Sequence, residues 1–212
     1  MPLYREWSSD PFSLAAIWKI DEPESFFTER TGVTSTIASE KRRLEHLAGR
    51  FLLRHLKEDF PLLSIIPDIH DKPRIPENQY FFSISHSFPY VAAVVSPYVE
   101  CGIDVQVWHS RMEKLQYKFL SASERILFNS DTKLLSLAWS AKEAAYKWQG
   151  RRGVEFSRDL VIKSLKEENG ELRLLFDLPL TNPRMEIQVS GRLEPDFSLA
   201  LVRHTDVLHP TF

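Results

Sequence analysis

The sequence has one cysteine, Cys101, among its 212 residues. A single thiol excludes an internal disulfide and a multi-cysteine zinc site, so we expect a reducing compartment. No apolar run approaches the roughly 18 residues of a membrane-spanning helix, and the first residues, MPLYREWSSDP, lack the apolar segment of a secretory signal. These absences predict a soluble, cytoplasmic protein that does not bind membranes.

An excess of positive charge is also missing. Lysine and arginine number 27 against 29 aspartates and glutamates, which argues against a nucleic-acid-binding protein and requires any anion site to be local. The phosphate-loop pattern GxxxxGK[ST], the dinucleotide pattern GxGxxG and the hydrolase pattern GxSxG are all absent. With 43% hydrophobic residues, the chain can form one large domain or two of about 100 residues each.

A long amphipathic helix is predicted over residues 39–58. Apolar side chains recur there every three or four residues, the spacing of one helical face. Five basic residues fall within roughly 120° of arc on another side of this helix, and these are Arg42, Arg43, Arg50, Arg54 and Lys57. Most such stripes are solvated helix faces, and the alternative is a cradle for an anion.

A second long helix is predicted from Asp131 to Gln149, ending at Gly150. Glu143 and Lys147 lie one turn apart on it and face the same way. By spacing alone this is an ordinary surface ion pair, worth about 0.2 to 0.5 kcal/mol.

Strand patterns surround an acidic residue in the middle of the chain. Residues 80–96 predict a hairpin, and residues 101–108 alternate apolar and polar side chains as a half-buried strand does. Asp104 and Gln106 share one face of that strand. An aspartate in so apolar a segment requires solvent, a partner or a cation, and a structural hydrogen bond is the ordinary alternative. Gly102 suits a point where another backbone or a ligand approaches closely.

Two segments together resemble the signature of the 4′-phosphopantetheinyl transferases. They are CGIDVQVW at 101–108 and WSAKEAAYK at 139–147, a Gly-Ile-Asp strand followed by a Ser-x-Lys-Glu-x-x-x-Lys helix. Three further blocks agree in order, namely KRRLEHLAGR at 41–50, DKPRIP at 71–76 and SISHS at 83–87. The chain particularly resembles the larger, monomeric members that activate peptide synthetases and related carrier proteins.

The resemblance implies an α+β fold of two similar halves related by a pseudo-two-fold axis. Each half would be a long helix packed on a small antiparallel sheet, with coenzyme A bound between the halves. We expect residues 1–99 to form the N-terminal half, which contacts the phosphates and adenine of coenzyme A. Residues 100–212 would form the C-terminal half, with the metal site and the catalytic helix.

The implied reaction moves 4′-phosphopantetheine from coenzyme A to a serine of an apo acyl or peptidyl carrier protein and releases adenosine 3′,5′-bisphosphate. Asp104 and Glu143 match positions that hold Mg²⁺, with Gln106 as a third candidate ligand. Glu143 would also accept the serine proton, and Lys147 would neutralise phosphate oxygens. The positions that match coenzyme A contacts are Arg42, Arg50, Lys72, Ser85, His86, Asp104 and Lys147.

Gln106 departs from the family pattern, because many relatives carry glutamate there. An amide can coordinate Mg²⁺ only through its carbonyl oxygen, so we expect a weaker metal site rather than an inactive protein. One alternative is a coenzyme A- or nucleotide-binding module without turnover. Another is a metal-dependent phosphohydrolase, for which clustered acids and histidines are too few.

A basic stripe on a shorter predicted helix, residues 111–119, is a candidate docking surface for the carrier protein. Arg111, Lys114 and Lys118 lie on one side of this helix, and carrier proteins tend to be acidic around their serine. The alternative is a solvated helix over the core. Carriers of fatty acid, polyketide and peptide synthesis all fit this expectation.

Overall fold

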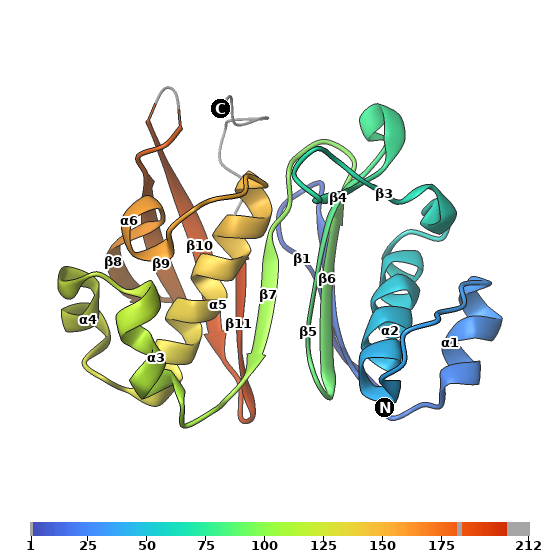
Figure 1. Ribbon diagram of the computed structural model, residues 1–212, viewed down its shortest axis with the longest axis horizontal. Helices are drawn as coiled ribbons and strands as arrows, with labels where there is room; N and C mark the ends of the chain where they lie inside the picture. The colour runs from blue at the N-terminus through green and yellow to red at the C-terminus, as the bar shows by residue number, and fades with distance from the viewer. Residues whose placement is uncertain (1, 182–183, 203–212) are drawn as a thin grey trace. The chain divides into compact units, whose positions relative to one another are not determined.

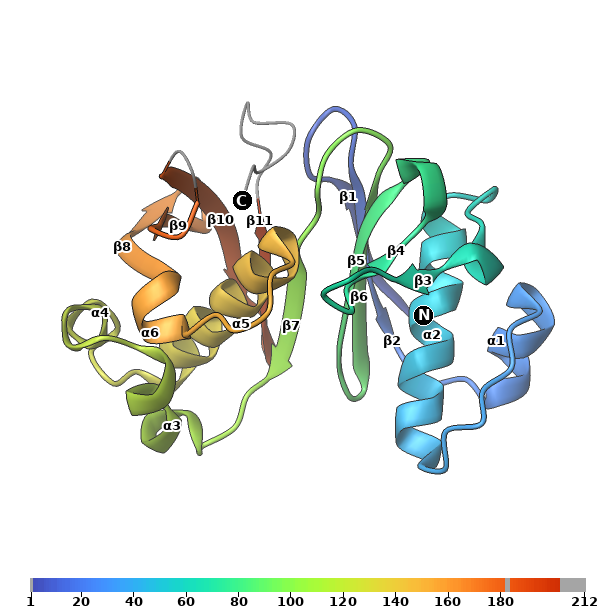
Figure 2. The same cartoon turned by 45° about the horizontal axis from the view of Figure 1, so that its top comes forward.

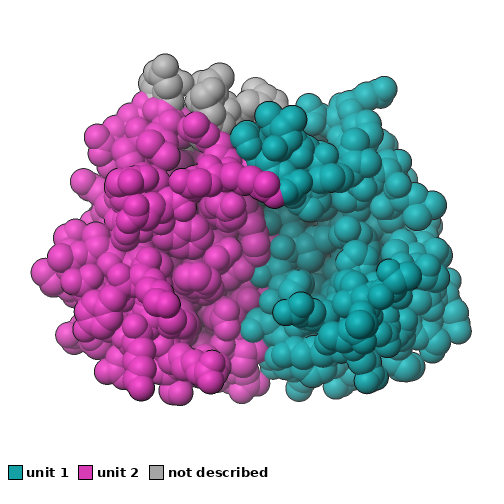
Figure 3. Space-filling model, viewed as in Figure 1, with its two compact units in different colours: residues 1–101 teal, residues 102–212 magenta. Residues whose placement is uncertain are grey.

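The computed structural model describes residues 2–181 and 184–202. The chain divides into two compact units, unit 1 (Met1–Cys101) and unit 2 (Gly102–Phe212), which are coloured separately in Figure 3. Each unit, taken by itself, is a long helix packed on an antiparallel sheet, so the predicted α+β fold class is confirmed. Within the described ranges, no helix has both the length and the hydropathy to cross a membrane.

Unit 1 is built on a four-stranded antiparallel sheet. In spatial order its strands are β1 (Leu3–Ser8), β2 (Leu14–Lys19), β6 (Tyr90–Ser96) and β5 (Phe81–Ser87). Helix α2 (Glu40–Leu56) covers one face of this sheet, and α1 (Glu24–Thr31) lies on the outer side of α2 (Figures 1 and 2). A short pair of strands, β3 (Ile66–Pro67) and β4 (Pro73–Arg74), lies in the connection between α2 and β5.

The core of unit 1 follows from the amphipathic pattern of α2. Its buried leucines, among them Leu47 and Leu52, pack against Phe82 on β5 and Val91 on β6. Gly49 marks the closest approach of helix and sheet, because a Cβ there would lie 3.0 Å from Cγ2 of Ile84. The predicted helix and the predicted hairpin are confirmed, and the helix brings its middle turns onto the second half of β5.

Unit 2 is built on a five-stranded antiparallel sheet. In spatial order its strands are β7 (Ile103–Val107), β11 (Phe197–Val202), β10 (Met185–Leu193), β9 (Glu171–Leu178) and β8 (Val161–Glu168). Helix α5 (Thr132–Gln149) packs on β7, β10 and β11 (Figure 1). The smaller helices of this unit are α3 (Met112–Phe119), α4 (Ala122–Phe128) and α6 (Phe156–Asp159).

The sequence explains both ends of α5 and its close contact with β7. The Asp131 carboxylate accepts hydrogen bonds from the first free N–H groups of the helix, and Gly150 ends it in the left-handed conformation at φ 73°. A Cβ on Gly102 would lie 2.1 Å from the carbonyl oxygen of Ala144. The predicted close approach at Gly102 is therefore confirmed, and the approaching backbone is that of α5.

Two parts of unit 1 differ from the sequence prediction. β1 was not predicted, because its residues are alternately exposed and half-buried at the sheet edge and carry no run of apolar side chains. The segment from Pro61 to Pro76, whose four prolines favour a loop, contains the short β3–β4 pair and a 3₁₀ turn.

Candidate functional site

In unit 2, Asp104 and Lys147 form an ion pair between β7 and α5. The Nζ atom of Lys147 lies 2.7 Å from Oδ1 of Asp104 and also donates to the Ile103 carbonyl at 3.2 Å. Asp104 has only 8% of its side chain exposed, against 26% for Lys147. The aspartate in the apolar strand thus has a partner on the helix, which spacing within α5 alone did not predict.

Glu143 lies one helical turn before Lys147 and is half-buried. Burial, and after it the negative charge of Asp104, raises the pKa of Glu143 to about 7, although Lys147 acts in the opposite direction. Asp104 thus lies near enough to Glu143 for its charge to act on that carboxyl group. A carboxyl group with a pKa near 7 can accept a proton at neutral pH and is suited to general base catalysis.

The donor set around Asp104 fits a hard cation. Within the described residues, no group of three or more histidine, cysteine, aspartate or glutamate side chains could hold a metal ion. Asp104 and Glu143 nevertheless share one lysine, Lys147, so the pair carries excess negative charge when both are ionised. Mg²⁺ commonly uses only one or two protein carboxylates and completes its shell with water and phosphate oxygens, so Asp104 and Glu143 suit it.

Gln106 lies on the same face of β7 as Asp104, two residues along the strand. Its Nε2 atom donates a hydrogen bond of 2.9 Å to the carbonyl oxygen of Val107. With the NH₂ group used in this way, the carbonyl oxygen of the amide is the atom that could contact a cation.

The first lysine of the WSAKEAAYK segment, Lys142, is fully buried. Its Nζ atom lies 2.6 Å from Oε1 of Glu124 and donates to the Phe156 carbonyl at 2.8 Å. Glu124 also accepts hydrogen bonds from the backbone N–H groups of Ser121, as its capping box predicts, and of Ile162. Burial lowers the pKa of Lys142 to about 8. This pair ties α4, α6 and β8 to α5 next to Glu143.

In unit 1, a basic cluster forms where α2 packs on β5. Arg42, His46 and Arg50 lie four residues apart on one face of α2, and His86 comes from β5. Burial, followed by the charges of Arg50 and His86, lowers the pKa of His46, and burial lowers that of Arg50. His46 and Arg50 are partly buried and His86 is exposed, and positive charges gathered in this way form a site that an anion would stabilise.

His46 was not among the predicted site residues. The sequence repeats Arg42, His46 and Arg50 at intervals of four, and this spacing is the signal that places His46 beside the two arginines. We therefore add His46 to the candidate anion site.

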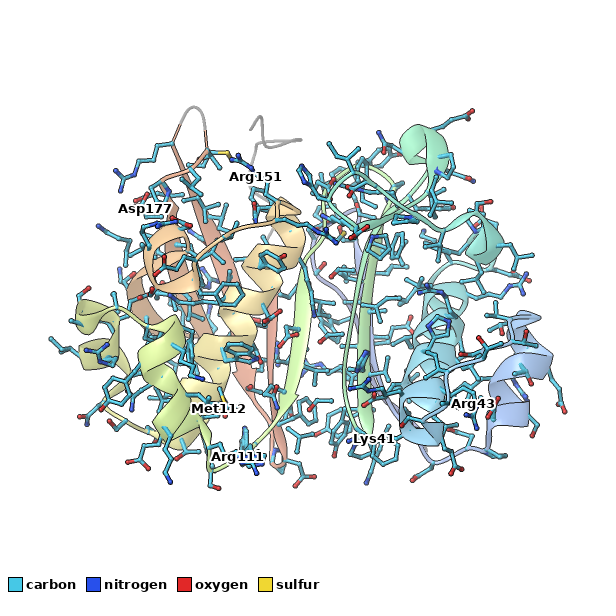
Figure 4. All side chains as sticks on the ribbon, in the orientation of Figure 1. Lys41, Arg43, Arg111, Met112, Arg151 and Asp177 are labelled. Atoms are coloured by element: carbon cyan, nitrogen blue, oxygen red, sulfur yellow. The ribbon has the colours of Figure 1, made fainter. Side chains whose placement is uncertain are left out.

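The other arginines of the predicted cationic stripe have structural contacts. Arg43 donates to Glu24 at 2.7 Å and to the Ile37 carbonyl (Figure 4), and Arg54 donates to the Thr31 carbonyl at 3.1 Å. These contacts hold α1 and the segment after it against α2. The stripe thus divides into a structural part and a part that could bind an anion.

Two further predicted contacts lie apart from this basic cluster. Ser85 is buried on the face of β5 opposite to His86, because neighbouring strand residues alternate. The Nζ atom of Lys72 lies 2.8 Å from Oε2 of Glu100, and both side chains are buried. The assignment of Ser85 and Lys72 to coenzyme A stays a prediction.

Residues 100–202 match the family model of the 4′-phosphopantetheinyl transferase superfamily. These residues belong to that superfamily. The matched range contains Asp104, Glu143 and Lys147, so the 4′-phosphopantetheinyl transferase signature predicted from residues 101–108 and 139–147 is confirmed. The three blocks between residues 41 and 87 lie outside the range that matches the transferase model.

A relative of this transferase segment is enterobactin synthase component D of Salmonella typhi, which is 33% identical to the chain over 118 residues. The aligned part is 52% of this chain and 49% of the relative. The chain thus spans about half the length of the relative that it matches.

Proposed function

We propose that this chain transfers 4′-phosphopantetheine from coenzyme A to a serine of an apo acyl or peptidyl carrier protein, with release of adenosine 3′,5′-bisphosphate. One observation carries the proposal. On the segment that matches the family, Glu143 combines a pKa raised to about 7 with a neighbouring carboxylate and a neighbouring lysine. A protein that only binds coenzyme A has no need of such a base.

Glu143 would accept the proton of the carrier serine, directly or through a water molecule. The serine oxygen would form a bond to the phosphorus that carries the pantetheine arm, and the bond from that phosphorus to the bridging oxygen of the diphosphate would break. Lys147 would neutralise charge that accumulates on the phosphate oxygens as the bond breaks. Its contact with Asp104 holds the ammonium group in place beside Glu143.

Asp104 and Glu143 would hold Mg²⁺, with Gln106 as a weaker oxygen donor through its amide carbonyl. Bound there, Mg²⁺ would neutralise negative charge on the diphosphate of coenzyme A. The excess of carboxylate over lysine in this part of unit 2 supports this assignment.

Unit 1 would bind the nucleotide end of coenzyme A. Arg42, Arg50 and His86, joined by His46, offer positive charge and N–H donors to phosphate groups. Lys72 and Ser85 are proposed as further contacts because they match the family's positions. The burial of Lys72 against Glu100 makes it the less accessible of the two.

The expected partners are an apo carrier protein and coenzyme A, with no role for nucleic acid or a membrane. We further propose that the protein acts as a monomer, like the larger family members that it resembles, and in the cytoplasm, which its single cysteine favours. Its similarity to enterobactin synthase component D makes a carrier domain of such a synthase a good first substrate to test.

The deciding experiment measures the intact mass of an apo carrier protein after incubation with this chain, coenzyme A and Mg²⁺. We expect the carrier to gain the mass of one phosphopantetheine, and we expect EDTA to prevent the gain. A chain that binds coenzyme A but leaves the mass of every tested carrier unchanged would instead be a binding module without turnover.

A further inference from the structure

Glu45 is a buried acid at the edge of the basic cluster in unit 1. Its residue is only 5% exposed. Its Oε1 atom accepts a hydrogen bond of 3.1 Å from the backbone N–H of Phe88, and Oε2 lies 3.3 Å from Nδ1 of His86. One carboxylate on α2 therefore contacts both the end of β5 and the turn that follows it.

The same turn of α2 makes a second contact with this hairpin. Lys41, one helical turn before Glu45, places its ammonium group 5.4 Å from the centroid of the Phe88 ring (Figure 4). Such a contact is attractive because the face of an aromatic ring carries partial negative charge. The turn after β5 is thus held from two positions on α2, and His86 is held with it.

The chemistry of a carboxylate determines how His86 must be protonated. An ionised glutamate only accepts hydrogen bonds, so the ring nitrogen that faces it carries a proton. The two nitrogens lie on different edges of the ring, and the His86 side chain is 52% exposed although Glu45 is buried. With Nδ1 directed at Glu45, Nε2 is the ring nitrogen left for a ligand to contact.

We propose that Glu45 is a positioning residue that holds His86 by its Nδ1–H group and directs the Nε2 edge toward a phosphate of the nucleotide end of coenzyme A. The proposal rests on the proposed function for its ligand, but the position of the proton does not depend on any ligand. With Nδ1 already protonated, a proton on Nε2 makes His86 a cationic donor, which binds a phosphate anion more strongly than a neutral N–H group does.

Glutamine at position 45 cannot reproduce this arrangement. The Phe88 N–H is a donor and must face the amide oxygen, so the NH₂ group of Gln faces Nδ1 of His86. Two donors cannot share a hydrogen bond, and the ring responds by moving its proton to Nε2 and accepting at Nδ1. Glu45→Gln therefore keeps the shape of the site and places an NH₂ donor where the carboxylate oxygen faced Nδ1 of His86.

Long-range ¹H–¹⁵N spectra of the full chain without ligand test the first half of the proposal. In the wild-type protein at a pH where His86 is neutral, Nδ1 should carry the proton, and in Glu45→Gln Nε2 should carry it. A wild-type His86 with its proton on Nε2 would overturn the proposal without the need for any variant.

Binding of coenzyme A and of adenosine 3′,5′-bisphosphate, measured by calorimetry, tests the second half. Glu45→Gln should bind both about tenfold more weakly, because a neutral N–H group replaces a cationic one as the donor to phosphate. Glu6→Gln is the matched control. Glu6 lies 2.7 Å from Nε2 of His55, a histidine that is on the same helix as Glu45 but outside the cluster. The affinities of this variant should equal those of the wild type.

A second variant separates positioning from folding. If Glu45 acts through His86, then Glu45→Gln should add no further loss in a His86→Gln background. An equal loss in both backgrounds would show that Glu45 acts in some other way. A wild-type protein that binds neither ligand would contradict the proposed function instead, while the spectra would still decide the protonation of His86.

Discussion

Glu143 combines two properties that oppose each other in an unliganded protein. As a base it must lose its proton near neutral pH, and yet its burial and the nearby charge of Asp104 make the ionised form costly. Lys147 offsets part of that cost but is also bound to Asp104. Two acids share one lysine here, so the ionised site lacks one positive charge. Such an arrangement is typical of a functional site, because a structural site would be neutralised by its own residues.

Replacing Glu143 with glutamine should abolish transfer while leaving the fold intact. The amide has nearly the same size but cannot accept the serine proton, and a positioned general base contributes about 10² to 10⁴ in rate. We expect kcat in the carrier-modification assay to fall by at least that factor and the circular dichroism spectrum to remain that of the wild type.

Gln106→Glu is the informative companion to Glu143→Gln. It restores the acid that many relatives carry on this strand and should retain transfer, with half-maximal activity reached at lower Mg²⁺ concentration. An active Glu143→Gln protein would remove both the base and the ligand assignment of Glu143.

At the scale of elements, the site depends on how closely β7 approaches α5. Gly102 permits this approach, because any Cβ there would meet Ala144 O at 2.1 Å and Trp148 Cβ at 2.8 Å. Gly102 lies two residues before Asp104. On the helix, Ala144 directly follows Glu143 and Trp148 directly follows Lys147. The spacing between strand and helix therefore controls whether Asp104 and Lys147 can meet.

We expect Gly102→Ala to lower both stability and activity. The strand must move away from α5 or the helix must shift, and overpacking of this kind costs roughly 1–3 kcal/mol or more. Urea unfolding should show the loss of stability, and kcat should fall at temperatures where the protein remains folded. Gly49→Ala is the milder comparison, because the nearest atom to its Cβ would be a side-chain methyl, Cγ2 of Ile84 at 3.0 Å, and not a backbone atom. Equal stability of Gly102→Ala and wild type would contradict this account.

Helix α3 presents the basic stripe proposed to dock the carrier protein. Met112 and Phe119 are buried against the core, whereas Leu115 and Tyr117 are exposed among Lys114 and Lys118. Arg111 lies at the start of this helix (Figure 4). Exposed apolar and aromatic side chains among lysines suit an acidic partner helix better than a purely solvated face does.

Reversing the charge of Arg111 and Lys114 together should raise the KM for the carrier protein about fivefold or more and leave coenzyme A affinity unchanged. The effect should shrink as salt is added, since surface charges are screened at high ionic strength. Reversal at the exposed Lys166 on β8 is the control and should change neither value. An unchanged KM in the double variant would exclude this stripe as the docking surface.

The elements that could be predicted are those with a strong local signal. The period of α2 and α5, the capping residues of α4 and α5, and the aromatic and β-branched runs of β5 and β6 all follow from neighbouring residues. Strand β1 lacks such a signal, since it is ordered by pairing with β2 rather than by its own pattern. Spacing likewise placed Lys147 beside Glu143 on the helix, but its bond to Asp104, 43 residues away, depends on the packing of β7 on α5.

For the whole molecule, the net charge is −2, so an excess of positive charge can exist only locally. This requires any anion site to be local, and the basic cluster of α2 and His86 is the candidate in unit 1. The sequence could not show which arginines of α2 remain available for an anion, because Arg43 and Arg54 are used by contacts with residues up to 24 positions earlier. Such contacts depend on the placement of α1, which the helical period of α2 does not encode.

Stability toward acid should depend on aspartate–arginine pairs in both units. In unit 2, hydrogen bonds from Arg184 and Arg158 lower the pKa of Asp177 and Asp159, respectively. In unit 1 the pKa of Asp68 is also lowered, because burial is outweighed by the N–H groups of His70 and Lys72 and by Arg74. The folded state therefore binds fewer protons than the unfolded state just below the ordinary aspartate pKa of 3.8. The stabilisation is complete above that pH and is lost as the pH falls through the folded-state values.

Asp177→Asn tests this dependence. Asp177 is buried, and its carboxylate accepts a hydrogen bond of 2.6 Å from Nε of Arg184. The amide of asparagine is uncharged, so its hydrogen bond to the guanidinium is weaker. The variant should melt below the wild type at pH 7, and the two melting curves should converge as the pH is lowered below 3.8. Glu167→Gln, at an exposed position on β8, should follow the wild type throughout. A constant difference in melting temperature across this range would mean that Asp177 contributes through packing alone, because only the ionised carboxylate loses its advantage on protonation.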